Sequence, residues 1–480
     1  MLFNSFEFCF IFFPLVTGLY FLLPHRHRWK LLLAASCWFY MAFVPVYILI
    51  LAFTIGVDYV SGLMIEPAQG RRRKLFLTAS VVANVSVLAV FKYWDFLNQS
   101  IGAIFQTWGL PYAIPDLGML LPIGLSFHTF QSLSYTIEVY RGKQQAERNL
   151  GIFSLYVMFY PQLVAGPTAR PATLPRQLRL RFDVDYARIL HGLKQMLWGF
   201  FKKLVIADRC AVIVDMVYQD PSAHDGWTTL LATYLFAVQI YCDFSGYTDI
   251  ALGAARVMGF NLMVNFRTPY TSASISEFWS RWHISLSSWF RDYLYIPLGG
   301  NRVARSRWFF NLMLVFLISG LWHGARWTYV VWGGLHGAYL VLAIVFAALW
   351  KQVGLTSEGK SRHWRWLNVF ITFHLVLVAW VLFRAESFSD AATIFNRWLG
   401  WESGGAGVMS LVDELKPVMF AITIGFAVLF MIIDPILDAW VKKERPIPSR
   451  RFDFALHATL LAACLLFGFY GETMFIYFQF

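Results

Sequence analysis

Residues 309–337 read FFNLMLVFLISGLWHGARWTYVVWGGLHG, and this stretch decides the fold class. Two apolar runs begin in it, 309–321 and 328–349, and neither contains an Asp, Glu, Lys or Arg. Only a short polar stretch with His323 separates them. A helix of about 20 apolar residues spans the ~30 Å hydrocarbon core of a bilayer. We therefore expect an all-α membrane protein with a histidine at the end of an apolar helix.

The whole chain has the composition of a polytopic membrane protein. Of its 480 residues, 58% are hydrophobic and only 14% are charged, which is more apolar surface than a soluble domain can bury. The apolar runs cover residues 8–23, 29–41, 46–64, 75–91, 119–137, 152–164, 189–205, 230–241, 309–321, 328–349, 366–383, 418–433 and 454–469. Several are short, so we expect ten to twelve crossings, with the remainder as half-helices or re-entrant pieces. No low-complexity linker divides the chain, and we treat 1–480 as one domain.

The net charge of +12 is distributed as short basic clusters between apolar runs. Such clusters set membrane topology and do not indicate a nucleic-acid surface. By the positive-inside rule we place them in the cytoplasm: residues 26–30, 71–74, 141–148, 170–181, 291–307, 351–365 and 442–451. The loops 95–116, 215–225 and 386–416 are poor in basic residues and face outward, as do both termini. The runs 152–164 and 309–349 fit this topology only as re-entrant pairs.

The first apolar run and the cysteines exclude two further features, a signal peptide and a disulfide or metal framework. The first apolar run, 8–23, follows no basic segment and precedes no small-residue cleavage site, so we interpret it as a membrane segment rather than a signal peptide. The five cysteines lie in or beside apolar runs without the spacing of metal ligands. We expect neither a disulfide framework nor a metal site.

Three of the eleven histidines stand out by their context. An ionisable side chain inside a membrane segment is costly unless it is paired or hydrated, and it therefore marks function. His323 ends an apolar run, beside Gly324, which leaves room for close approach of a substrate or backbone. His336 lies 13 residues further on, between glycines. For both, the alternative is a histidine that merely packs between helices.

His283 lies in SEFWSRWHISLSSWFRDYLYIPLGGN, residues 276–301. Large apolar residues recur there every three or four positions from Phe278 to Tyr293, while His283, Ser287 and Arg291 share another face. This spacing predicts an amphipathic helix at the cytoplasmic interface or along a hydrated funnel. The alternative is a surface helix whose arginines touch lipid phosphates.

The chemistry that these residues favour is general-base catalysis. A neutral imidazole can take a proton from a hydroxyl at cellular pH, and apolar surroundings keep it neutral. The sequence has no GxSxG, P-loop, GxGxxG or HExxH, which argues for direct transfer rather than a covalent enzyme intermediate, nucleotide hydrolysis or zinc chemistry. Asp243, Asp249, His128 and Gln131 indicate a polar cavity, unless the two aspartates only pair with Arg or Tyr on neighbouring helices.

The chain resembles the membrane-bound O-acyltransferase (MBOAT) family, in its bacterial alginate O-acetyltransferase branch, nearly end to end. The resemblance rests on LPIGLSFHTFQSLSYTIEVYRG (121–142), FYPQLVAGPTARP (159–171), FKKLVIADR (201–209), QIYCDFSGYTDIALG (239–253), MGFNLMVNFRTPY (258–270), the segment around His283, GLWHGARWTYVVWGGLHG (320–337), LFRAE (382–386) and the closing FIYFQF (475–480). It implies a ring of helices around a central funnel that reaches the histidine.

The resemblance also implies an enzyme of the bacterial inner membrane that moves acetyl from cytoplasmic acetyl-CoA, with no bound cofactor, to a hydroxyl of an exported polysaccharide. The family's essential histidine maps onto His323, and its second polar position onto His283. In several such systems a periplasmic partner of the SGNH-hydrolase type completes the transfer. Candidate substrate-binding or funnel-lining residues are His336, Trp322, Arg281, Trp282, Arg291, Asp292, Asp243 and Tyr247. Arg281, Arg291 and Arg302 are candidates to attract the anionic CoA.

Two other functions are compatible with the same sequence. The chain could be a non-catalytic carrier or channel for the acyl donor or the glycan, with His323 as a gate, or a scaffold of a polysaccharide export complex. Neither composition nor motifs identify the acceptor, for which alginate, cellulose, another exopolysaccharide and peptidoglycan are all candidates.

Overall fold

The computed structural model describes residues 1–119, 121–163, 166–352, 362–400, 404–442, 449–471 and 475–476. Within these ranges the regular structure is helical, which confirms the predicted all-α class. Parts of several predicted features lie outside them: residue 120 of the run 119–137, the end of the run 152–164 with part of the motif 159–171, residues 401–403 of the loop 386–416, parts of the basic clusters 351–365 and 442–451, and the closing FIYFQF beyond its first two residues. The chain forms two compact units, Met1–Met196 with Ile250–Met263, and Leu197–Asp249 with Val264–Phe480.

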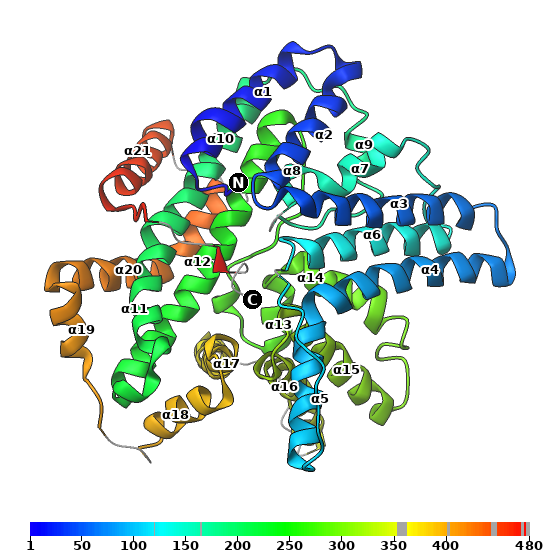
Figure 1. The fold of residues 1–480 in the computed structure, drawn as a ribbon. Helices are drawn as coiled ribbons and strands as arrows, with labels where there is room; N and C mark the ends of the chain where they lie inside the picture. The colour runs from blue at the N-terminus through cyan, green and yellow to red at the C-terminus, as the bar shows by residue number, and fades with distance from the viewer. Residues whose placement is uncertain are drawn as a thin grey trace. The chain divides into compact units, whose positions relative to one another are not determined.

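The first unit contains the N-terminal helices (Figure 1). They are α1 (Phe13–Leu22), α2 (His25–Met41), α3 (Ile48–Ile65), α4 (Gly70–Leu88), α5 (Trp94–Thr107), α6 (Leu125–Tyr140), α7 (Leu150–Met158), α8 (Tyr160–Leu163), α9 (Leu174–Gln177) and most of α10 (Tyr186–Phe200). Helices α3, α4 and α6 lie side by side (Figure 1). At their shared interface the Asp58 carboxylate accepts hydrogen bonds from Ser80 (2.5 Å), Asn84 (3.0 Å) and Thr136 (3.3 Å). Such interhelical bonds hold membrane helices together where lipid offers no polar partner.

The second unit contains the predicted catalytic segment. Its helices are α11 (Asp208–Gln219), most of α12 (Gly226–Met258), α13 (Ile275–Arg281), α14 (Ile284–Phe290), α15 (Arg305–His323), α16 (Trp327–Gln352), α17 (Arg362–Arg384), α18 (Phe388–Trp398), α19 (Val408–Leu415), α20 (Pro417–Val441) and α21 (Arg450–Phe467). Two wider, π-helical stretches matter for the site, η4 (Phe201–Ala207) before α11 and η7 (Arg291–Tyr295) after α14.

Five described helical segments are long and apolar enough to cross a membrane: Pro45–Ile65, Gly70–Thr107, Trp327–Trp350, His363–Arg384 and Pro417–Val441. Large apolar side chains cover their outer faces, with Phe53, Leu75 and Val82 all more than half exposed, while Asp58 is fully buried. This distribution, apolar outside and polar inside, is the one that a lipid solvent favours. The protein is therefore a multi-pass membrane protein, and the count of ten to twelve crossings stays a prediction.

Two predicted boundaries were wrong. The run 230–241 was expected to end before Asp243, but α12 is 33 residues long and continues to Met258, because buried lysines pair with Asp243 and Asp249 and keep the helix in the protein interior. The segment from residue 95 was expected to be a loop. It is helical as far as Thr107, because α4 continues through a π-helical stretch into α5.

The stretch that decides the fold forms a tight helical hairpin. Helix α15 ends at His323, three residues follow, and α16 begins at Trp327 and packs along α15. Glycines line the contact: a Cβ on Gly320 would overlap the Tyr329 carbonyl, and a Cβ on Gly333 would overlap that of Phe316. The two backbones therefore approach as closely as small residues permit, and the hairpin fixes the position of His323.

Candidate active site

His323 lies at the C-terminal end of α15 with its side chain buried. Aromatic rings surround the imidazole, with ring centres 4.9 Å away for Trp332, 5.0 Å for Trp322 and 5.6 Å for Phe383. The neighbouring Gly324 is required by packing, because a Cβ there would overlap the ring of Tyr329. The room that the sequence suggested at Gly324 is thus filled by a protein side chain.

His283 does not lie within a continuous amphipathic helix, as the spacing had predicted. The chain breaks there into α13 and α14, and His283 adopts a left-handed conformation with φ 44° and ψ 54°. The break has a local cause: the Ile284 amide donates to the Asn265 carbonyl (2.9 Å), and the Ser285 amide donates to the Asn265 side chain (3.2 Å). Asn265 thereby replaces the acceptors that a continuous helix would supply. The left-handed region is rare for residues other than glycine and concentrates at functional sites.

The structure brings the two predicted catalytic histidines together. The ring centres of His283 and His323 are 6.4 Å apart, and Trp322 contacts both rings. His283 lies outside the five membrane spans, and burial lowers its pKa to about 3, so its imidazole is neutral at cellular pH. Ring centres at this distance put both imidazoles in one region of the fold, where they can face the same bound group. This geometry suits a base and a second polar group acting on one centre.

His336 is fully buried in α16, one helical turn from Trp332, whose ring also contacts His323. The Trp279 indole N–H donates to His336 Nδ1 at 3.3 Å. Because an indole nitrogen only donates, Nδ1 is unprotonated and the ring proton resides on Nε2. Among the described residues Nε2 has no hydrogen-bond partner. His336 therefore belongs to the same aromatic cluster, behind Trp332.

Asp243 and Tyr247 lie on α12 and flank Phe244, whose ring centre is 4.7 Å from that of His283. Asp243 is buried against the Lys203 ammonium at 2.7 Å and accepts the Ile476 amide at 2.7 Å. The ring of Tyr247 stacks on Phe475 at 4.4 Å. The alternative that Asp243 and Asp249 only pair with neighbouring helices thus has support, although their partners are lysines and not Arg or Tyr. Trp282 is likewise a packing residue, buried between Phe266, at 5.1 Å, and Trp380, at 5.1 Å.

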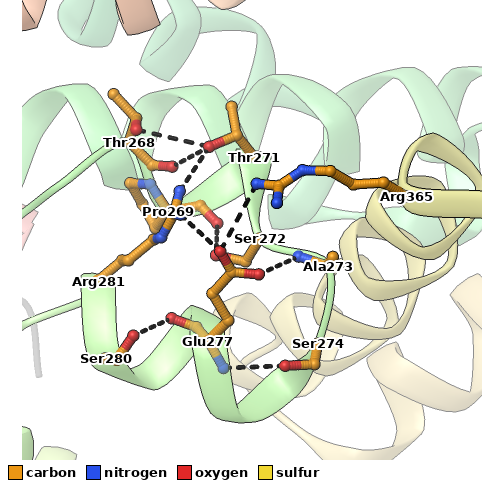
Figure 2. A network of polar contacts seen from close by, with 10 residues as sticks. All are labelled: Thr268, Pro269, Thr271, Ser272, Ala273, Ser274, Glu277, Ser280, Arg281 and Arg365. Atoms are coloured by element: carbon orange, nitrogen blue, oxygen red, sulfur yellow. Dashed lines mark hydrogen bonds and ion pairs between the residues drawn. The ribbon is translucent and has the colours of Figure 1, made fainter. Parts of the chain in front are cut away.

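The predicted arginines are not part of this cluster. Figure 2 shows Arg281 bonded to Glu277 at 2.5 Å and to the Thr271 hydroxyl at 2.8 Å, with Arg365 of α17 at 3.9 Å from the same carboxylate. Glu277 also accepts the Ala273 amide, and Ser274 caps α13 (Figure 2). Arg281, the last residue of α13, therefore joins the end of this helix to Glu277 and to the turn that precedes it.

Arg291 is largely exposed and pairs with Asp292 at 2.8 Å. It lines a cavity of about 310 Å³ between α13, α14, α15 and α16, with Trp279, Phe316 and Ser319 among the other lining residues. Neither His283 nor His323 lines this cavity. Arg302 is exposed in the turn before α15.

Two kinds of residue were missed by sequence reasoning. Asn265 fixes the break at His283, and Lys202 and Lys203 neutralise Asp249 and Asp243. The two lysines carried a usable signal, since paired cations at the end of the apolar run 189–205 need buried anions. Asn265 carried none, because its partners depend on how two distant segments pack.

Comparisons with known proteins show which family the sequence is similar to. The family model of the membrane-bound O-acyltransferases matches residues 149–384, a range that includes every predicted site residue. The probable alginate O-acetylase AlgI of Azotobacter vinelandii is 42% identical over 82% of this chain and 76% of its own length. The corresponding protein of Pseudomonas aeruginosa is 41% identical over 82% and 74%.

A third relative acts on a different polymer. The peptidoglycan O-acetyltransferase of Helicobacter pylori is 33% identical over 83% of this chain and 80% of its own length. The predicted family resemblance is thus confirmed over most of the sequence. The chain belongs to the membrane-bound O-acyltransferase family, and it is an acyltransferase.

Proposed function

We propose that the protein O-acetylates an exported polysaccharide, taking the acetyl group from a cytoplasmic donor, acetyl-CoA, and acting from the bacterial inner membrane. The observation that carries the proposal is the buried pair of His283 and His323, with ring centres 6.4 Å apart inside an aromatic shell. The names of the relatives support the class of acceptor, because two are named as probable alginate O-acetylases and one as a peptidoglycan O-acetyltransferase.

In the proposed mechanism His323 is the general base. Its imidazole takes the proton from the acceptor hydroxyl, whose oxygen attacks the thioester carbonyl. His283, neutral and close to the same centre, stabilises the developing oxyanion as a hydrogen-bond donor. The tetrahedral intermediate then expels the thiolate of CoA, which recovers the proton from His323. An acetyl ester and free CoA result, so atoms and charges balance.

The acceptor at this site is either the polysaccharide hydroxyl itself or a group that passes the acetyl on. We propose that a periplasmic partner of the SGNH-hydrolase type completes the transfer in the second case. Both routes require His323 to accept a proton, so they share the same test. Among the described residues we find no feature that specifically favours a non-catalytic carrier, and the family's activity supports the enzyme.

The experiment is to replace His323 with alanine and with glutamine in a host that secretes an O-acetylated polymer. We expect both variants to lose polymer acetylation by at least a hundredfold at unchanged protein level, because general-base catalysis contributes roughly 10²–10⁴-fold. His374→Ala is the matched control. His374 also lies on a membrane helix, but it bonds to Tyr234 at 2.7 Å and to the Phe370 carbonyl at 2.8 Å, outside the aromatic cluster of His323.

A second assay distinguishes an enzyme from a conduit. Purified protein in detergent should transfer or hydrolyse the acetyl group of acetyl-CoA, and the His323→Ala protein should do neither. Full polymer acetylation by His323→Ala would refute the proposed role of His323. Absence of any acetyl-CoA turnover by well-folded wild-type protein, with its partner added, would refute the proposed donor.

A further inference from the structure

A second cavity, of about 640 Å³, lies in the first unit and is lined by basic residues. Its wall consists of the loop after α6, the end of α3, the start of α4 and residues 171–179. The positive-inside rule predicts that the basic clusters 141–148 and 170–181, which contribute to this wall, lie on the cytoplasmic side. The cavity therefore belongs to a part of the molecule that meets cytoplasmic solutes and the inner surface of the membrane.

The loop after α6 has a conformation defined by hydrogen bonds. Gly142 adopts a left-handed conformation, with φ 69°, and its amide donates to the Val139 carbonyl while that of Lys143 donates to Glu138. This is the glycine-dependent way of ending a helix. The loop is then tied down at both carboxylates of the cavity. Glu66 accepts the Ala146 amide at 3.1 Å, and Glu147 accepts the Asn149 amide at 2.9 Å.

Those same carboxylates each hold one arginine. Glu66 pairs with Arg148, and Glu147 accepts two contacts from Arg179, at 2.5 and 2.6 Å. Both anions of the lining are therefore already engaged, by the loop backbone and by one cation each. The charge of the other lining side chains therefore determines which ligands the cavity attracts.

The remaining charge is positive. The lining holds five cationic side chains, Arg73, Lys143, Arg148, Arg176 and Arg179, against Glu66 and Glu147, an excess of three. Counting Glu138, which lies 4.0 Å from Lys143, reduces the excess to two. Among the described residues neither Arg73 nor Arg176 has a carboxylate partner. Arg73 donates instead to the Val139 carbonyl at 3.1 Å, and its buried Nε has no hydrogen-bond partner there.

We propose that this cavity binds a ligand that carries two or more phosphate groups, with Arg73 and Arg176 as its main contacts. Guanidinium groups bind phosphate oxygens through paired, charge-assisted hydrogen bonds, and a cavity of one charge sign concentrates the opposite ion. Two sources have this chemistry: the phosphorylated nucleotide part of a soluble acyl donor, and the headgroups of anionic lipids. The first source rests on the proposed function, while the phosphate chemistry does not.

The test measures binding rather than acetylation. Purified protein in neutral detergent is titrated with adenosine 3′,5′-bisphosphate, and the same protein in nanodiscs of phosphatidylcholine with or without phosphatidylglycerol is examined for retained anionic lipid. Arg176 is exposed, so we expect Arg176→Gln to leave the fold intact. We expect this variant to bind about tenfold more weakly, with Arg73→Gln/Arg176→Gln weaker still and Arg176→Lys partly restored. Arg72→Gln/Arg181→Gln is the matched control, since both residues are exposed and neither lines the cavity.

Each outcome decides a separate point. Weakened nucleotide binding in the detergent arm identifies the soluble source, and weakened retention of phosphatidylglycerol alone identifies the lipid source. Both support the phosphate site. Unchanged binding of both probes by the double variant, or equal losses in the control variant, would overturn it. Because no arm depends on acyl transfer, a failed phosphate site leaves the His323 test untouched, and loss of the His323 mechanism leaves the binding result intact.

Discussion

At the scale of single residues, His283 combines a rare backbone conformation with a buried imidazole. Its left-handed backbone is held by Asn265, which accepts the two amides that follow the break. A left-handed conformation costs a residue with a Cβ roughly 1–2 kcal/mol, and the surrounding structure must compensate for it. Histidine therefore occupies a position whose backbone conformation disfavours any side chain. This favours a role of the imidazole in the site.

Two substitutions at His283 separate the backbone from the imidazole. Both His283→Ala and His283→Gly remove the ring, so we expect both to lose most polymer acetylation. Glycine tolerates the left-handed backbone, so the glycine variant should be more stable than the alanine variant by about 1 kcal/mol. Thermal unfolding in detergent checks the difference. A glycine variant that keeps full acetylation would show that His283 only shapes the chain.

At the residue scale, the sequence shows most where the cost of burial is local. A histidine at the end of an uncharged run is conspicuous in the sequence alone, and the structure buries His323 with its ring centre 6.4 Å from that of His283, while the catalytic role of both stays a prediction. The roles of Asn265 and Lys203 were not predictable in this way. Their partners lie 20 and 40 positions away, so each role exists only after the segments have packed.

At the scale of elements, the hairpin of α15 and α16 determines where His323 lies. Its backbones touch at Gly320 and Gly333, and the connecting turn has three residues. At this point, where the structure shows a hairpin of two helices with the second long and apolar enough to cross a membrane, the sequence predicted a re-entrant pair. It did not predict which glycines form the contact, because that depends on the rotation of each helix about its axis.

Adjacent glycines of α16 provide a matched test of this contact. A Cβ on Gly333 would overlap the backbone of Phe316, whereas one on Gly334 would meet only the Leu317 side chain, at 3.3 Å. We expect Gly333→Ala to destabilise the protein by about 1–3 kcal/mol through overpacking and to reduce acetylation. Gly334→Ala should change stability by less, because a side chain can move where a backbone cannot. Equal melting temperatures of the two variants would argue against a backbone contact.

Helix α12 is kept in the interior by ion pairs. Lys202 Nζ lies 2.5 Å from Asp249, and both side chains are almost completely buried. Removing one partner of a buried pair costs about 3–5 kcal/mol, because the other charge is left uncompensated. We expect Lys202→Met and Asp249→Leu each to lower the yield of folded protein strongly. The double variant should recover much of it, measured by gel filtration in detergent. If the double variant is the least stable of the three, the pair itself contributes net stability.

At the scale of the whole molecule, the apolar surface and the positions of the basic clusters are both those of a membrane protein. The multi-pass architecture could be predicted because runs of about 20 apolar residues have few other uses. The orientation rests on the basic clusters, and the number of crossings is less accessible from sequence, because α12 is long and yet polar inside. Its buried aspartates hid a helix that hydropathy alone cuts at residue 241.

Orientation can be measured with two introduced cysteines. Lys143 and Ala223 are both exposed, and the sequence places the first in the cytoplasm and the second outside. We expect a membrane-impermeant maleimide to label Ala223→Cys in intact spheroplasts, and to label Lys143→Cys only after lysis. The wild type serves as the background, since its five cysteines are buried or half-buried. The reverse pattern would invert the topology.

The pairing of η4 with α12 also constrains how the chain enters the membrane. Lys202 and Lys203 are synthesised about 40 residues before Asp243 and Asp249. A lysine alone at the centre of a bilayer costs roughly 2.5–3.5 kcal/mol on the scale of translocon insertion. The segment with the lysines is therefore unstable in lipid until α12 has been made. We therefore expect this part of the chain to insert as a joint step, with the translocon holding the first segment until its anionic partner arrives.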